Sequence, residues 1–254
     1  MLRRGITLLV LLLLAMLAAP AYAAPELPPV GTHFDYQLGG IRPLPGHVGI
    51  VVRDRRATPA AGRYNVCYVN GFQTQPNERR FWRQHWRLVL KRGGEPVVDE
   101  AWGEWLLDIR TREKRRKLAR IVGRWVDGCA ADGFAGVEFD NLDSFVRSRG
   151  LVDRRDSTAF ARLLVRQSHA AGLAAAQKNR APWDGTAVGF DFAIAEECAR
   201  WRECGQYVDH YGRQVLVVEY RGRDFRRACR RWDDRISVVR RDLALSRHGV
   251  RRWC

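Results

Sequence analysis

The stretch "GFAGVEFDNLDSF", residues 133–145, decides the fold, because an apolar strand-like run ends there in a group of acids. Side chains alternate along a strand, so Val137 and Phe139 share one side while Glu138 and Asp140 share the other. Carboxylates are costly to bury unless a neighbouring group needs their charge. The stretch therefore predicts a buried strand whose carboxyl end faces a functional site.

Similar runs recur along the chain and are separated by segments able to form helices. Their apolar, Val- and Ile-rich character is typical of a parallel sheet covered on both faces. The segments 112–128 and 156–171 have helical spacing, and Gly172 follows the second as a C-cap. The strand-like runs cover residues 33–38, 47–54, 64–70, 104–109, 136–140, 173–179, 190–196, 214–220 and 236–242.

Strands that alternate with helices indicate βα units, and about eight units predict an α/β fold of the TIM-barrel type, a (β/α)8 barrel in a single domain. Nine runs compete for the eight barrel positions. We take residues 47–54 as the first barrel strand. Residues 33–38 are then an extra N-terminal strand-like element near the barrel mouth.

The N-terminal residues predict export from the cell. Two arginines precede an almost wholly apolar run at 6–17, and Ala21-Tyr22-Ala23 is a small-x-small cleavage site, as in a secretory signal peptide. The alternative, a membrane anchor, is disfavoured because a span needs about 20 apolar residues. We expect a signal peptide at 1–23, a leader at 24–31 and the barrel domain at 32–254. The product is then a secreted monomer with no membrane contact after signal removal.

Six cysteines follow the predicted signal peptide, and an even number in an exported chain favours disulfides over metal ligands. Cysteine and histidine spacings give no metal site, and no motif implies a cofactor. Barrel geometry brings Cys67 and Cys129 to the same end of the barrel. The close pair Cys198 and Cys204 follows the sixth strand, which leaves Cys229 for the terminal Cys254. We therefore predict the disulfides Cys67–Cys129, Cys198–Cys204 and Cys229–Cys254.

The formal net charge is +16, and forty of the 44 basic residues are arginine. Such a charge is compatible with a nucleic-acid or anionic-surface binder. However, no basic tail, nucleic-acid fold signature or alternation of aromatic and basic residues concentrates it. We expect a solvated basic surface and no nucleic-acid partner.

Polar residues gather where the predicted strands end, which is where a (β/α)8 barrel carries its active site. Glu138 and Asp140 end the fourth strand and Glu196 ends the sixth, so these carboxylates should converge. Single acids such as Asp54 and Asp242 are more typical of caps. Two convergent carboxylates favour glycoside hydrolysis, in which one protonates the leaving oxygen and the other attacks or activates water. Aromatic residues near the strand ends are able to stack on sugars: Tyr36, Tyr68, Phe72, Trp102, Trp105, Phe139 and Tyr220.

Several spaced motifs together resemble glycoside hydrolase family 114, the endo-α-1,4-polygalactosaminidases, which have a (β/α)8 barrel. In chain order they are Phe34-x-Tyr36-Gln37-Leu38, Val66-Cys67-Tyr68, residues 103–109 (GEWLLDI), residues 133–141 (GFAGVEFDN), Gln177-Lys178-Asn179 and residues 191–198 (DFAIAEEC). The resemblance implies that Asp140, flanked by Glu138, and Glu196 form the catalytic pair. Two departures from the family pattern stand beside them: Glu138-Phe139 replaces Asp-Pro, and Ala195 replaces Asn.

The sequence and the resemblance together predict a glycoside hydrolase that cleaves an α-1,4-linked, galactosamine-containing polysaccharide. A cationic amino sugar fits an acidic barrel mouth. The alternative is a carbohydrate-binding barrel without catalysis, and both the role of each acid and the stereochemical outcome stay open. The expected substrate-binding residues are Tyr36, Gln37, Tyr68, Trp102, Glu104, Asp108, Glu138, Asn141, Lys178, Glu197, Glu219 and Tyr220.

Overall fold

The computed structural model describes residues 24–254. The predicted signal peptide lies outside the described residues. The segment expected to form the leader, residues 24–31, leads directly into the first strand. Within residues 24–254, no helix has both the length and the apolar character needed to cross a membrane.

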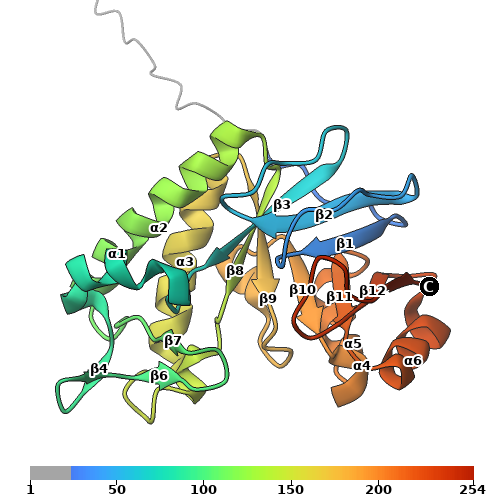
Figure 1. Ribbon diagram of the computed structural model, residues 1–254. Helices are drawn as coiled ribbons and strands as arrows, with labels where there is room; N and C mark the ends of the chain where they lie inside the picture. The colour runs from blue at the N-terminus through green and yellow to red at the C-terminus, as the bar shows by residue number, and fades with distance from the viewer. Residues whose placement is uncertain (1–23) are drawn as a thin grey trace, which may run out of the picture.

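A parallel sheet curls into a nearly closed barrel at the centre of the molecule (Figure 1). Eight neighbouring strands pair in parallel, and a ninth, β13, pairs antiparallel with the last of them. The strands in sheet order are β1 (His33–Gln37), β2 (Val48–Asp54), β3 (Tyr64–Asn70), β8 (Gly136–Asp140), β9 (Ala174–Lys178), β10 (Phe192–Glu196), β11 (Val215–Glu219), β12 (Ser237–Arg241) and β13 (Arg251–Trp253).

The strand assignment differs from the prediction at two places. β1 pairs in parallel with β2 and is the first barrel strand rather than an extra element. The run at 104–109 is not a barrel strand, because only Glu104 and Trp105 form β7, which pairs antiparallel with β6 (Val98–Asp99). One barrel strand is added before β8 and one is removed, so β8 is still the fourth barrel strand and β10 the sixth.

Helices cover the outside of the barrel on part of its circumference only. No helix separates β1, β2 and β3, whereas a long excursion with two hairpins joins β3 to β8. The helices are α1 (Arg79–Gln84), α2 (Arg112–Asp132), α3 (Arg154–Ala170), α4 (Cys198–Trp201), α5 (Cys204–Tyr211) and α6 (Gly222–Trp232), with 3-10 turns at Pro76–Glu78, Trp86–Leu88, Ser144–Val146 and Gly185–Val188. The first hairpin consists of β4 (Lys91–Arg92) and β5 (Glu95–Pro96), and the second of β6 and β7.

The two longest helices have recognisable ends. α2 begins after Thr111, whose side chain accepts from the backbone N–H of Lys114, and it ends at Gly133 in the left-handed region. α3 begins with a capping box between Asp153 and Asp156, so it starts slightly earlier than the sequence predicts. α2 and α3 pack against each other on one side of the barrel (Figure 1).

Alternation along the strands divides the core into two parts. One set of side chains fills the barrel, including Phe34, Tyr36, Tyr68 and Phe192. The other set, including Val137, packs between the strands and the helices. Residues that share the inward side at the carboxyl end of a strand therefore point toward the barrel mouth.

The barrel closes between β1 and β12 through side chains. Asp35, which is fully buried, lies 3.4 Å from Arg241 and 2.9 Å from Arg251. The indole N–H of Trp253 on β13 donates to the carbonyl of Phe34 at 2.8 Å. β13 thus spans the gap between the first and last parallel strands.

All six cysteines form disulfides, in the pairs expected from the sequence: Cys67–Cys129, Cys198–Cys204 and Cys229–Cys254. The first ties β3 to α2, and the third ties the C-terminus to α6. The carboxylate of Glu219 lies near the Cys198 and Cys204 sulfurs, but those sulfurs are already joined to each other.

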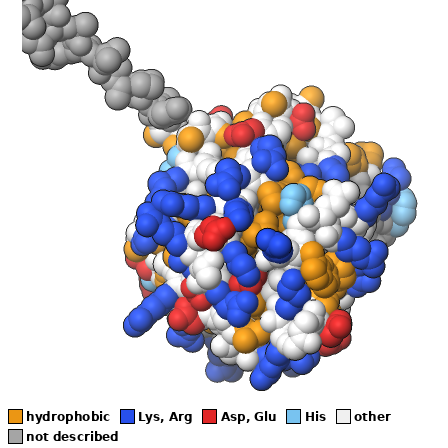
Figure 2. All heavy atoms as spheres, turned by 90° about the vertical axis from the view of Figure 1, so that its left-hand side faces the viewer, with side chains coloured by type: hydrophobic (Ala, Val, Ile, Leu, Met, Phe, Trp, Pro, Cys, Tyr) orange, Lys and Arg blue, Asp and Glu red, His pale blue; other side chains and the backbone are white. Residues whose placement is uncertain are grey.

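Basic side chains are spread widely over the exterior. On the face that carries α1 and α2, Figure 2 shows Lys and Arg side chains distributed over the visible surface rather than gathered in one stripe. The basic residues therefore form no single binding stripe on this face.

Candidate active site

A cavity of about 350 Å³ opens at the carboxyl ends of the barrel strands. Its walls come from several strand ends, from the hairpin of β6 and β7, and from the loop after β12. The lining residues are Tyr36, Leu38, Gly39, Asp54, Tyr68, Gln75, Asp99, Trp102, Glu104, Asp140, Asn141, Asp143, Arg147, Lys178, Asn179, Glu196, Tyr220, Leu243, Ala244 and Leu245.

Acids outnumber bases in this cavity, although the chain as a whole is strongly basic. The bases are Arg147 and Lys178. The acids are Asp54, Asp99, Glu104, Asp140, Asp143 and Glu196. Since a cleft lined by one sign of charge attracts ligands of the other sign, the mouth of the barrel favours a cationic ligand.

Lys178, at the end of β9, is the centre of the buried charge cluster. Its ammonium nitrogen lies 2.8 Å from Glu138 Oε1, and 3.4 Å from both Asp140 Oδ1 and Glu196 Oε2. It also donates to the hydroxyl of Tyr36 at 2.9 Å. Burial alone would lower the pKa of Lys178, but Asp140, Glu138 and Glu196 together raise it well above its ordinary value. The ammonium therefore stays charged.

Asp140 is held in its ionised form. Tyr68 donates its hydroxyl to Oδ2 at 2.7 Å, and the backbone N–H of Asn141 donates to Oδ1 at 2.8 Å. Burial alone would raise the pKa of Asp140, but the Lys178 charge and these hydrogen bonds bring it below its ordinary value. A carboxylate with a low pKa suits a nucleophile or a base.

Glu196, at the end of β10, is oriented by two side chains. The amide of Asn179 donates to Oε2 at 3.0 Å, and the hydroxyl of Tyr220 donates to Oε1. The backbone N–H of Glu196 in turn donates to Asn179 Oδ1 at 2.8 Å. The side chain keeps 25% of its surface exposed, so it is open to a ligand in the cavity.

Glu138 lies below the cavity floor and not on its surface. It is fully buried and receives the Tyr36 hydroxyl at 2.5 Å in addition to the Lys178 ammonium. Burial raises the pKa of Glu138 to about 7, against the lowering effect of Lys178. Its second oxygen has no partner among the described residues. Glu138 therefore supports Lys178 and Tyr36 from inside the barrel.

Glu104, in β7, closes one side of the cavity through an amide network. Asn70 donates to Glu104 Oε2 at 2.9 Å, and Asn141 donates to Asn70 Oδ1 at 3.0 Å. Burial raises the pKa of Glu104 to about 7, while the Asn70 hydrogen bond lowers it and Asp140 raises it further. The network connects the excursion after β3 to the backbone that follows Asp140.

The structure brings most of the predicted site residues together. Nine of them line the cavity, and Glu138 adjoins it from below. The nine are Tyr36, Tyr68, Trp102, Glu104, Asp140, Asn141, Lys178, Glu196 and Tyr220.

Four predicted residues lie away from the cavity and make other contacts. Gln37 is on the outward side of β1, where it bonds Asp35 and Arg53. Glu219 is on the outward side of β11 and accepts the backbone N–H of Ala199 at 2.7 Å. Asp108 pairs with Arg110 and Lys114, and Glu197 pairs with Arg200.

Four charged residues of the cavity, Asp54, Asp99, Asp143 and Arg147, were missing from the sequence prediction of the site. Arg147 lies 2.8 Å from Asp99 and 2.7 Å from Asp143. The four-residue spacing of Asp143 and Arg147 is the only sequence signal for this group. Asp54 also lines the cavity, and no helix follows β2 for it to cap.

The arrangement is chemically competent for displacement at a sugar carbon. Asp140 Oδ1 and Glu196 Oε2 each lie 3.4 Å from one nitrogen, so they are separated by at most twice that distance. Paired carboxylates of glycosidases are about 5–5.5 Å apart in retaining enzymes and about 6.5–9.5 Å apart in inverting ones. This upper limit on the distance between the two oxygens allows the whole retaining range but only the lowest part of the inverting range.

Comparison with known proteins adds a family and a fold. The profile of Glycoside-hydrolase family GH114 matches residues 15–254. Among solved structures, Ega3 of Aspergillus fumigatus, crystallised in complex with galactosamine, superposes with a TM-score of 0.73 at 19% identity, covering 92% of this chain and 100% of that one. The glycoside hydrolase domain of PelA from Pseudomonas aeruginosa superposes with a TM-score of 0.58 at 17% identity, covering 89% and 98%. A search of curated protein sequences gives no match.

Proposed function

Because the chain belongs to glycoside hydrolase family GH114, we propose that it hydrolyses an α-1,4-linked polysaccharide containing galactosamine, with Asp140 and Glu196 as the catalytic pair. The observation that carries this proposal is the contact of both carboxylates with the one buried ammonium of Lys178. Among the described residues, Asp99 and Asp143 also share a cation, Arg147, but that side chain is 28% exposed, whereas Lys178 is only 2% exposed.

The two acids have different surroundings, which suggests different roles. Asp140 has a lowered pKa and receives two hydrogen bonds, so it acts as the nucleophile. Glu196 is the more exposed of the two and acts as the acid/base. In the first step, Asp140 forms a bond to the anomeric carbon while Glu196 gives its proton to the departing glycosidic oxygen. In the second, Glu196 takes a proton from water, and that water displaces Asp140 with overall retention of configuration.

The substrate class is supported by the charge of the cavity. An unacetylated galactosamine unit carries an ammonium group, and six acids line the site against two bases. The complex of Ega3 with galactosamine supports the same class of ligand, since the two proteins share their fold. Trp102, which is exposed at the cavity edge, offers a ring face for a sugar unit.

Three disulfides support an extracellular location, because such bonds persist in oxidising compartments. We propose that the chain is exported and acts on polysaccharide outside the cell as a monomer. Neither a cofactor nor a metal enters the proposed reaction.

The proposal is tested by digesting a soluble α-1,4-linked galactosamine polymer and the same polymer after full N-acetylation. We expect oligosaccharides from the unacetylated polymer and little or no product from the acetylated one, because acetylation removes the ammonium charge. Binding of the unacetylated polymer without any cleavage would instead favour a carbohydrate-binding barrel. Equal cleavage of both polymers would contradict the role given to the acidic cavity.

A further inference from the structure

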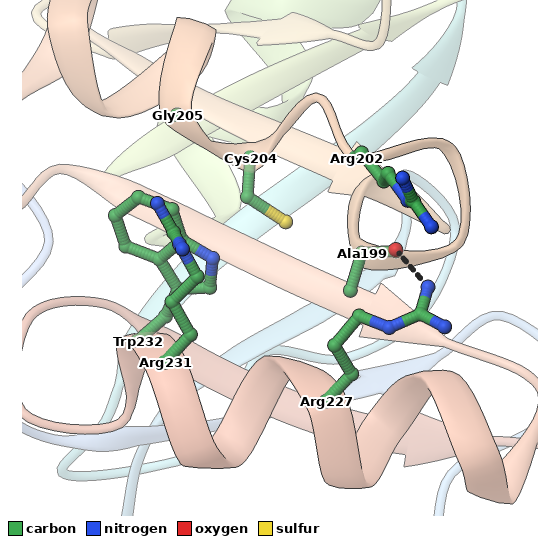
Figure 3. A pocket seen from close by; sticks show the side chains of 7 residues that line it. All are labelled: Ala199, Arg202, Cys204, Gly205, Arg227, Arg231 and Trp232. Carbon is green, nitrogen blue, oxygen red and sulfur yellow. Dashed lines mark hydrogen bonds between the residues drawn. The ribbon is translucent and has the colours of Figure 1, made fainter.

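A second cavity, of about 480 Å³, lies outside the barrel between α4, α5 and α6 (Figure 3). It is lined by Ala199, Arg202, Cys204, Gly205, Arg227, Arg231 and Trp232. None of these residues lines the cavity at the barrel mouth, so the two sites are separate. We call this second cavity the arginine pocket.

We infer that the arginine pocket binds the anionic group of an acidic saccharide, a carboxylate or a phosphate. The inference does not depend on the proposed reaction at Asp140 and Glu196. It rests on the charge, the shape and the surroundings of the pocket itself.

The charge of the pocket is of one sign. Three of its seven lining residues are arginines, and none is an acid. Arg202 and Arg231 make no ion pair with any residue of the 24–254 segment, whereas Arg227 lies 3.5 Å from the buried Asp224. Arg227 also donates to the carbonyl of Ala199 at 2.9 Å, which fixes its guanidinium beside the pocket. A guanidinium matches a carboxylate or phosphate with two parallel hydrogen bonds.

The arrangement of the side chains leaves room for more than a bare ion. Figure 3 shows Arg202 and Arg227 on one side of the pocket, with Arg231 and Trp232 on the other. The rest of the lining is apolar, from Ala199, Gly205 and the disulfide-bonded Cys204. The volume falls in the range of about 300–1,000 Å³ that is typical of small-ligand sites. Arginines on both sides of the pocket, with apolar residues between them, suit a sugar ring that carries a negative group.

The same surroundings disfavour a nucleic acid. Single-stranded binders need aromatic faces on which bases stack. Trp232 is only 9% exposed, and its ring lies beneath the guanidinium groups of Arg231 and Arg235, at 5.2 and 5.6 Å from the ring centre. Little of this ring is therefore exposed for a base to stack on.

An exposed aromatic side chain lies on α4, the helix that also carries Ala199. Trp201 ends α4, two residues after Ala199, and its side chain is 59% exposed. A sugar chain that extends from the pocket across α4 would contact this ring. α4 in turn begins two residues after Glu196, and the Cys198–Cys204 disulfide holds it in place.

The test compares two double variants with the same change in charge. Arg202→Gln with Arg231→Gln removes the two unpaired arginines of the pocket. Arg116→Gln with Arg120→Gln removes two exposed arginines of α2, on the opposite side of the molecule (Figure 1). Calorimetric titration would measure binding of a short galacturonic acid oligomer, a hexose phosphate, a neutral galactose oligomer and a single-stranded DNA at fixed salt. Thermal unfolding of each variant shows that it is folded.

We expect the unsubstituted protein to bind at least one of the two acidic saccharides and not the neutral one. The pocket variant should lose about tenfold or more in affinity, and the α2 variant less than about twofold. Which acidic saccharide binds more tightly distinguishes a carboxylate ligand from a phosphate ligand. The single variant Arg231→Lys, which keeps the charge without the planar fork, should lose part of the affinity. It serves as the test if the double variant does not fold.

Three results would overturn the inference. The first is no saturable binding of either acidic saccharide, and the second is an equal loss of affinity in both double variants, which would indicate non-specific attraction. The third is tighter binding of DNA that depends on Arg202 and Arg231, which would identify a nucleic-acid site.

Discussion

Lys178 and Glu138 face each other inside the barrel, with 2.8 Å between the ammonium nitrogen and the nearer carboxylate oxygen. The side chains are only 2% and 0% exposed. The inward positions of β8 and β9 therefore hold a buried ion pair where small barrels otherwise pack apolar residues. The Lys178 ammonium also lies 3.4 Å from both Asp140 and Glu196, so this ion pair positions the cation that contacts the two proposed catalytic acids.

Lys178→Met should lower kcat/KM by about a hundredfold or more, because it removes the cation that favours the ionised form of Asp140. The sign of the pH effect follows directly. Without the Lys178 charge the pKa of Asp140 rises, so a larger fraction is protonated at a given pH. The acidic limb of the kcat/KM profile should move to higher pH, which initial rates of polymer cleavage at a series of pH values would measure.

The control for this change is Lys117→Met. Lys117 is half-exposed on α2, pairs with Glu113 at 2.5 Å and does not line the cavity. Its variant should keep the profile of the unsubstituted protein. An unshifted acidic limb in a folded Lys178→Met protein would mean that Lys178 does not set the protonation of the nucleophile.

The hydroxyl of Tyr68 provides a finer test of the same site. Tyr68→Phe removes the hydrogen bond to Asp140 Oδ2 and should lower kcat by about tenfold, with a smaller shift of the acidic limb in the same direction as in Lys178→Met.

Tyr64→Phe is the matched control for this change, because Tyr64 lies on the same strand, is equally buried at 7% and bonds the carbonyl of Glu26 instead. The two variants should lose similar stability, since each removes one buried hydrogen bond. Equal kinetics in the two would contradict a specific role for the Tyr68 hydroxyl.

Glu219 predicts a pH dependence of stability that is independent of catalysis. Burial raises its pKa to about 7, opposed by the hydrogen bond from Ala199, so between its ordinary value and about pH 7 the folded protein holds a proton that the unfolded chain has released. This group's contribution to stability therefore falls as the pH rises through that window. Glu219→Gln cannot ionise, so relative to the unsubstituted protein it should gain about 2–3 kcal/mol between about pH 5 and pH 8.

Denaturant unfolding at the two pH values would measure this gain. Glu95→Gln, at an exposed position in β5, is the control and should show no such change between the two. A constant difference between Glu219→Gln and the unsubstituted protein at both pH values would rule out the raised pKa.

The sequence predicts most of the barrel strands because each is a continuous apolar run. Such a run is recognisable in the sequence whichever strand it pairs with. It does not predict the partner of each run. The run at 33–38 is read as an extra element because no helix separates it from the next, yet β1 pairs with β2 along its length. The run at 104–109 has the composition of a strand, but Leu106 and Leu107 are buried within the excursion after β3.

The proposed site residues divide in the same way. Asp140, Lys178 and Glu196 are found because they end strands on the inward side. Gln37 and Glu219 also stand at strand ends, but one residue out of phase, so they point away from the cavity. The local sequence identifies a strand, but it does not always show which of the alternating side chains point into the barrel.

Asp99 and Arg147 were missed for a different reason. They lie in a short hairpin and just after a 3-10 turn, where no periodic pattern exists. The 2.8 Å ion pair between them depends on how the segment between β3 and β8 folds over the barrel mouth. Such contacts are visible only in three dimensions.

The most direct test of the central claim is the release of reducing ends from a soluble α-1,4-linked galactosamine polymer by the unsubstituted protein and by Asp140→Asn and Glu196→Gln. Each amide keeps the shape of the side chain but removes the charge or the transferable proton. We predict steady cleavage by the unsubstituted protein and a loss of at least about a thousandfold in each variant, with thermal unfolding unchanged enough to show that both are folded. Cleavage at near-normal rates by both amide variants would contradict the account.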